Sequence, residues 1–205
     1  MSKTVESHYY DKFSKRIVAD LAQWFYDFLN TGVEATVGRE LGQELTDLFG
    51  NRRVCDALYE LLRVVLQGKP AMALLHFDVQ TRAQGNEIGR AALYKGLILE
   101  SPRFQDVEYF VQAFIFLTAV PEDFRRVVRG FPDDFRLFVV DMTRVDGLKL
   151  LQLGTAPAAT FAVLSVVAPR NLLIRGIVQI LHSLDRPDER RIWTEAVFAF
   201  AKLRK

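Results

Sequence analysis

The run VEYFVQAFIFLTAV, residues 107–120, decides the fold class that we expect for this chain of 205 residues. Its large apolar residues recur mostly at intervals of three and four, which places them on one face of an α-helix: Val107, Phe110, Val111, Phe114, Ile115 and Leu117. Ser101 and Pro102 precede the run, and serine is a preferred helix cap while proline suits the first helical turn. The pattern therefore predicts a helix that opens at Ser101 and extends to Val120.

Towards the N-terminus, the clearest amphipathic pattern runs from about Val5 to Leu29. Its apolar residues again recur at intervals of three and four: Tyr10, Phe13, Ile17, Leu21, Trp24 and Phe28. Asn30 and Gly32 supply a helix stop, because both residue types tolerate the left-handed backbone conformation. The same reasoning predicts helices over residues 33–48, 52–67 and 88–99.

Towards the C-terminus, short apolar segments alternate with breaks. Pro121 and Pro132 each open a similar unit, PEDFR and PDDFR, and a looser variant, PDERR, begins at Pro187. We interpret these units as helix starts, since proline and acidic residues suit the first turn of a helix. The segment Phe138–Val140 would also suit a strand, but the signal at Pro132 favours a helix. Helices are expected over residues 135–144, 148–153, 158–168, 172–183 and 192–203.

No stretch shows sustained alternation of apolar and polar residues, so we assign no sheet and expect an all-α protein. About ten short helices fit either a compact multi-helix bundle or a short α-solenoid. We expect residues 1–205 to form a single all-helical domain with a weak internal boundary in the polar loop near 81–86. Half of the residues are hydrophobic, which is enough for one core without a metal or disulfide.

Composition and charge exclude several classes of protein. A net charge of +2 and a mean hydropathy of +0.07 are not those of a disordered chain. The most apolar stretch, Thr155–Leu181, contains Pro157, Pro169 and two arginines, so we expect two buried helices there and no transmembrane span. The single cysteine and the lack of a secretory signal at the start of the sequence predict an intracellular, cytoplasmic protein.

The sequence contains no recognisable catalytic, metal-binding or cofactor-binding motif. The three histidines, His8, His76 and His182, form no pair at the spacing of a zinc site, and no glycine-rich phosphate loop is present. Cys55 is interpreted as a small buried side chain. Asp141 and Arg175 lie within apolar runs, so each is expected to be partly buried with a structural partner.

These observations favour a non-enzymatic helical interaction protein, an adaptor, scaffold or subunit of a larger assembly, that acts through apolar and arginine-rich surfaces. A protein partner or self-association is expected. The candidate contact residues are Tyr10, Phe13, Trp24, Phe28, Phe124, Arg125, Arg126, Arg129, Phe135 and Arg136. A candidate basic patch comprises Arg186, Arg190, Arg191, Lys202, Arg204 and Lys205. The alternatives are a nucleic-acid-associated helical protein that self-assembles and an all-α enzyme or ligand carrier with an unrecognised pocket.

Overall fold

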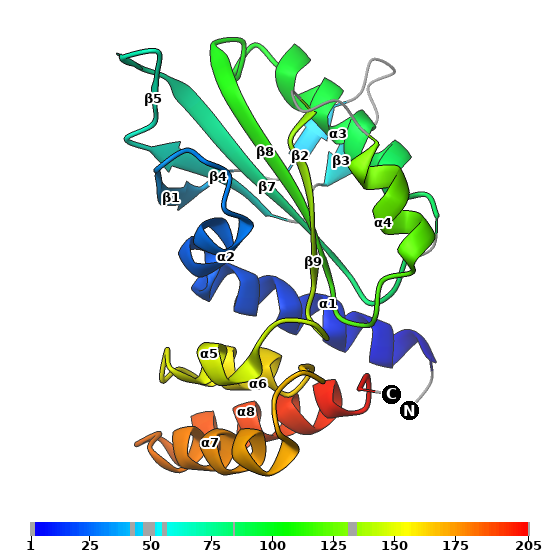
Figure 1. Ribbon diagram of the computed structural model, residues 1–205, viewed down its shortest axis with the longest axis vertical. Coiled ribbons are helices and arrows are strands. Elements are labelled where there is room, and N and C mark those ends of the chain that lie inside the picture. Colours follow the sequence, from blue (N-terminus) through cyan, green and yellow to red (C-terminus); the bar gives the residue numbers. More distant parts are fainter. Residues whose placement is uncertain are drawn as a thin grey trace. The chain divides into compact units, whose positions relative to one another are not determined.

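The computed structural model describes residues 3–41, 44–46, 52–54, 57–83, 85–130 and 135–204 (Figure 1). Its central feature is a five-stranded sheet with the order β1-β4-β7-β8-β9. These strands are β1 (Thr36–Glu40), β4 (Ala57–Leu62), β7 (Met72–Gln80), β8 (Val107–Phe116) and β9 (Leu137–Asp141). The all-α prediction is therefore wrong, and so are the helical bundle and the α-solenoid: the protein is a mixed α/β protein.

Eight helices and two small two-stranded sheets complete the described part of the chain. The helices are α1 (Lys3–Asp20), α2 (Ala22–Leu29), α3 (Glu87–Glu100), α4 (Glu122–Arg129), α5 (Gly147–Leu151), α6 (Ala156–Ala162), α7 (Arg170–His182) and α8 (Pro187–Ala201). The small sheets pair β2 (Glu44–Thr46) with β3 (Arg52–Val54), and β5 (Val65–Leu66) with β6 (Lys69–Pro70).

The main sheet is mixed in strand direction. β4 runs antiparallel to both β1 and β7, and its register with β7 pairs Leu58 with His76. β9 runs parallel to β8, because two hydrogen bonds advance along both strands in the same direction. Gln112 N donates to Arg136 O at 3.1 Å, and Met142 N donates to Phe116 O at 3.0 Å. Helices α3 and α4 lie between consecutive strands of this β7-β8-β9 region.

The error in fold class has a physical cause in the central strands. Residues 73–78 of β7 and residues 109–116 of β8 are buried without interruption. A strand that is covered on both faces reads as a continuous apolar run, without the alternation of a half-exposed strand. Short runs of that kind satisfy the spacing of a buried helix equally well. The predicted helix over 101–120 is wrong for this reason. The helices predicted over 33–48, 52–67 and 135–144 are also wrong, because β1, β4 and β9 lie within these ranges. These three strands are less completely buried and form by pairing with other parts of the chain.

Other predicted elements are confirmed. The helix expected over Val5–Leu29 is present as α1 and α2 with a break at Leu21, and Asn30 and Gly32 beyond it have φ of 48° and 76°. The helix predicted over 88–99 is α3. Pro121 precedes α4, and Pro187 stands in the first turn of α8. The predicted helices at 148–153, 158–168, 172–183 and 192–203 correspond to α5 through α8.

The chain divides into two compact units, which are described separately. The first comprises Met1–Leu21, Phe116–Val120 and Val140–Lys205, and the second comprises Ala22–Ile115 and Pro121–Val139. The predicted weak boundary near 81–86 lies within the second unit. Cys55, Gln84, residues 131–134 and Lys205 lie outside the described residues, so the predictions made for them stay predictions.

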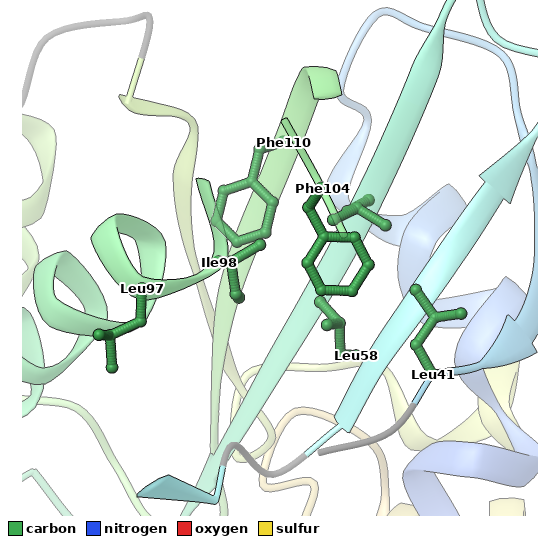
Figure 2. Close-up of a cluster of buried hydrophobic side chains, with 7 residues drawn as sticks. Leu41, Leu58, Leu97, Ile98, Phe104 and Phe110 are labelled. Atoms are coloured by element: carbon green, nitrogen blue, oxygen red, sulfur yellow. The ribbon is translucent and has the colours of Figure 1, made fainter. Parts of the chain in front are cut away.

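In the second unit, helices cover both faces of the sheet. On one face the ring of Phe25, in α2, packs against Phe77 of β7 with centroids 5.7 Å apart. On the other face, α3 and the segment after it close an apolar cluster against the strands (Figure 2). The cluster consists of Leu41, Leu58, Leu74, Leu97, Ile98, Phe104 and Phe110. We call the second face the α3 face.

In the first unit, α1 and α5–α8 share a separate core. The Tyr10 ring meets Phe200 edge to face at 5.5 Å, and its hydroxyl donates to Ala199 O at 2.9 Å. Every residue of α6 is buried. Gly147, which begins α5, is so close to its neighbours that an added Cβ would lie 2.6 Å from Leu173 Cδ2 and 2.9 Å from Ala162 O. The helices therefore pack tightly on their inner side.

Candidate functional site

Polar side chains gather on the α3 face of the sheet, in the second half of β7. Alternate residues of a strand point to the same face. Because Leu74 belongs to the cluster under α3, His76, Asp78 and Gln80 share its face. On β8, Phe110 also belongs to this cluster, so Gln112, two residues further on, lies on the same face. On a helix, residues two apart such as His76 and Asp78 would point in different directions; on strand β7 they share one face.

His76 and Gln112 are buried together beneath α3. Gln112 Nε2 lies 3.0 Å from His76 Nδ1 and donates to Ala91 O of α3 at 3.0 Å. Because the amide nitrogen can only donate, Nδ1 accepts and Nε2 carries the proton of the neutral ring. The edge of His76 also meets the ring of Tyr94 in α3, with centroids 5.5 Å apart. The pair thus connects β7, β8 and α3.

The His76 ring is neutral at physiological pH. Burial, and secondarily the positive charge of Arg90, lower its pKa from 6.5 to about 3. A general base needs a pKa near the working pH, so His76 is not suited to acid–base catalysis at neutral pH.

Asp78 and Arg90 form the second element of the cluster. Arg90 Nε donates to Asp78 Oδ2 and Arg90 Nη2 donates to Asp78 Oδ1, both at 3.0 Å. The Asp78 side chain is 5% exposed and that of Arg90 is 32% exposed, so the pair reaches the surface through the guanidinium. Gln80 Nε2 also donates to Asp78 Oδ1. This bidentate ion pair links the first turn of α3 to strand β7.

Two buried polar atoms in this cluster have no hydrogen-bond partner: His76 Nε2 and Gln112 Oε1. One is a donor and the other an acceptor, and such atoms are uncommon in native structures. Among the described residues no group of three or more His, Cys, Asp or Glu side chains is placed to hold a metal ion. A polar residue within an apolar strand, such as His76 or Gln112, is the sequence signal for this cluster, but it is visible only once the strands are known.

The candidate contact residues of the N-terminal helices are mostly engaged in packing. Tyr10 is buried, and the half-buried Phe13 ring meets Trp193 at 6.1 Å. In α2, Trp24 stacks on Phe28 with centroids 5.1 Å apart, and Phe28 is exposed. Of these four residues, Phe28 alone is exposed, with 47% of its surface accessible to solvent.

The candidate contact residues in and near α4 also interact with other residues of the chain. The Phe124 ring packs on Phe114 at 5.9 Å. The three arginines lie near acids of their own helix: Arg125 and Arg129 near Glu122, and Arg126 near Asp123. The next two candidates make cation–aromatic contacts, Phe135 with Lys95 at 4.3 Å and Arg136 with Tyr109 at 4.4 Å.

The residues of the predicted basic patch differ in their partners and in their exposure to solvent. Arg186 pairs with Asp188 at 2.8 Å. Arg190 Nη2 donates to Leu184 O at 2.6 Å and to His182 O at 3.3 Å, so it fixes the turn between α7 and α8. Arg191 and Lys202 are exposed, and Arg204 is half-buried.

Asp141 and Arg175, the two charged residues expected to be partly buried, differ in their exposure to solvent. Asp141 is buried and accepts from Val120 N at 3.1 Å and Thr143 N at 3.0 Å, which confirms structural partners for it. Arg175 is exposed on α7, so the expectation of partial burial is wrong for it. An apolar sequence context did not imply burial here, because α7 also exposes apolar side chains.

Those exposed apolar side chains form the second candidate site. We use the name α7 surface for four exposed residues, two on one side of α7 and two on the loop before it: Ile174 and Val178, and Val166 and Val167. Val167 is 62% exposed and Ile174 is 51% exposed, whereas Leu173 and Ile177 of the same helix are buried. The helix is thus apolar on its inner side and partly apolar on its outer side.

Comparison with known proteins identifies no relative. The chain matches no protein-family model, and no curated protein or solved structure matches it. No helix in the described part of the chain is long and apolar enough to cross a membrane.

Proposed function

We propose that the protein is a non-enzymatic interaction protein, an adaptor or subunit of a larger assembly, and that its partner docks on the α7 surface. The observation that carries this proposal is the concentration of exposed apolar side chains in one part of the chain. Among the residues that the structure describes, fifteen large apolar side chains are exposed, and eight of them lie from Leu153 to Phe198. A surface of this kind is typical of a binding site for another macromolecule.

Folding of the first unit does not account for these side chains. The inner side of the helices is already filled by buried residues, including all of α6 and, on α7, Leu173, Ile177, Ile180 and Leu181. Burying exposed apolar area stabilises a complex by about 25 cal/mol per Å² before the costs of association are subtracted. A partner that covers the α7 surface would therefore be stabilised by the burial of apolar area that remains exposed after folding.

The test compares two double variants with the wild type, each expressed at its native level in the host and purified with its associated proteins. I174D/V178D places two charges on the α7 surface, and L93D/L99D changes two exposed leucines of α3 as the matched control. We expect a companion species in stoichiometric amount with the wild type and the control but not with I174D/V178D. Identical profiles from all three proteins would contradict the proposal. Thermal melts establish that each variant is folded.

A ligand carrier or an enzyme is the second candidate function, and one observation favours it. His76 Nε2 and Gln112 Oε1 are a buried donor and a buried acceptor without partners on the α3 face. A neutral ligand with its own donor and acceptor would satisfy both. The test is a thermal-shift screen of neutral amides, alcohols and heterocycles against the wild type and Q112L. Stabilisation of the wild type alone supports a ligand site, whereas equal responses in both proteins contradict it.

A further inference from the structure

The α7 surface lies within a long stretch of chain that has no acidic residue. Residues 147–184, a segment of 38 residues, contain no Asp or Glu, although the whole chain has 25. The same segment contains Lys149, Arg170 and Arg175, and all three are exposed. No carboxylate of this segment therefore accompanies the exposed apolar side chains of the α7 surface.

The two arginines on α7, Arg170 and Arg175, differ in their partners from the arginines on α4 and at the start of α8. On α4 and at the start of α8, arginines lie near carboxylates of the same helix or turn, as Arg126 does with Asp123 and Arg186 with Asp188. In the described ranges, Arg170 and Arg175 make no ion pair within the chain. Their guanidinium groups are therefore available to carboxylates of another molecule.

We infer that the α7 surface binds a protein segment whose apolar side chains are flanked by Asp or Glu, an inference that rests on the proposed function. Apolar residues of the segment cover Ile174 and Val178, and its carboxylates pair with Arg170 and Arg175. The guanidinium group favours this occupant because its planar set of donors matches a carboxylate with two parallel hydrogen bonds. Arginine is also enriched in protein interfaces, whereas lysine is depleted.

The other possible occupants fit less well. A second copy would bring the same acid-free segment to the interface and supply no carboxylate from residues 147–184. Binding to anionic lipid is typically carried by clusters of four to eight basic residues, and membrane-interface anchors are typically Trp or Tyr. This segment has three basic residues, and the α7 surface has no aromatic side chain.

The test is photo-crosslinking of the full chain in its host. A benzophenone amino acid replaces Val178, and in the control protein it replaces Leu93, which is exposed on α3. The crosslinked products are identified by mass spectrometry. We expect peptides from one partner protein that carry apolar residues with at least two Asp or Glu beside them.

Charge-reversal variants decide whether the arginines recognise those acids. R170E/R175E should reduce the yield of the adduct by about tenfold or more, since each lost charge-assisted hydrogen bond weakens binding severalfold. R170Q/R175Q should give an intermediate loss, and the control R126E should have no effect, because Arg126 lies on α4. All three changes are at exposed positions, and thermal melts confirm folding.

The outcomes separate this inference from the proposed function. No adduct at position 178 above the level of the Leu93 control contradicts both. An adduct with a peptide that lacks acidic residues, or one that survives R170E/R175E, overturns the inference and leaves the proposed function intact. An adduct with lipid, nucleic acid or a second copy of the chain also overturns the inference.

Discussion

Gln112 Nε2 and His76 Nδ1 lie 3.0 Å apart in the interior of the second unit, where one side chain comes from β8 and the other from β7. The contact joins β7 to β8, and the same amide nitrogen also donates to Ala91 O of α3. A buried hydrogen bond of this kind fixes which strand positions and which helix meet. The two remaining polar atoms of the pair, His76 Nε2 and Gln112 Oε1, have no hydrogen-bond partner.

Acid should destabilise the protein through His76. The pKa of this ring is about 3 in the folded protein and near 6.5 in the unfolded chain, so the unfolded chain binds more protons between these values. Stability is therefore complete above pH 6.5 and decreases as the pH falls towards 3, by up to about 1.4 kcal/mol for each pH unit. Urea unfolding of the wild type and H76Q at pH 7, 6 and 5 measures this. The difference in stability between the two proteins should change with pH; a constant difference would contradict the assignment.

The Gln112 amide should stabilise the interior through its donor groups. Q112M has a similar volume but leaves His76 Nδ1 without a donor, and an unsatisfied buried group costs about 1–3 kcal/mol. We expect Q112M to lower the free energy of unfolding by that amount. In a double-mutant cycle with H76F, the combined loss should be smaller than the sum of the two single losses. Strictly additive losses would show that the two side chains do not interact.

The sequence permits correct prediction of the helices that have punctuated ends. In α3 the polar loop before Glu87 marks the start, and in α8 Pro187 stands in the first turn. α2 ends where Asn30 and Gly32 take positive φ, as the residue types suggest. Local chemistry at helix ends is therefore enough to place these elements.

The sheet could not be predicted in the same way, because its signal is not local. The β8 sequence VEYFVQAFIF is rich in β-branched and aromatic residues, but it is buried on both faces and shows no alternation. What makes it a strand is pairing with β9 and packing under α3 and α4, which come from other parts of the chain. The His76–Gln112 cluster was missed for the same reason, since 36 residues separate its two members.

The local sequence also does not predict which side of α7 is exposed to solvent. Ile174 and Ile177 are the same residue type three positions apart, yet the first is 51% exposed and the second is 4% exposed. The sequence predicts that α7 is apolar, and only the packing of α5, α6 and α8 determines which side is covered. We therefore propose α7, and not the N-terminal aromatic residues, as the contact surface.

The ion pair between Asp78 and Arg90 should be important for stability, unlike the exposed ion pairs. R90M removes the cation and leaves a buried carboxylate with fewer partners, which typically costs about 3 kcal/mol or more. The matched control is R39M, because Arg39 pairs with Glu60 at 3.5 Å and its side chain is 77% exposed. Exposed pairs contribute at most about 1 kcal/mol. Equal losses in urea unfolding for the two variants would contradict a structural role for the buried pair.

A methyl group at Gly147 should destabilise the first unit. The new Cβ would lie 2.6 Å from Leu173 Cδ2, 2.9 Å from Ala162 O and 2.9 Å from Ser165 Cβ. Leu173 can rotate, but the backbone oxygen of buried helix α6 cannot move without displacing its neighbours. Overpacking of this kind costs about 1–3 kcal/mol, and we expect G147A to fall in that range.

The control for this substitution is G96A. Gly96 lies in the middle of α3 with no atom within 4 Å of the added Cβ, so only the change in helix propensity remains. Alanine at such a position should stabilise the protein by about 0.5–1 kcal/mol. The two alanine substitutions should therefore shift the midpoint of urea unfolding in opposite directions. A shift in the same direction would mean that α6 and Leu173 do not constrain Gly147, and that the inner side of the helical unit is less tightly packed than its distances indicate.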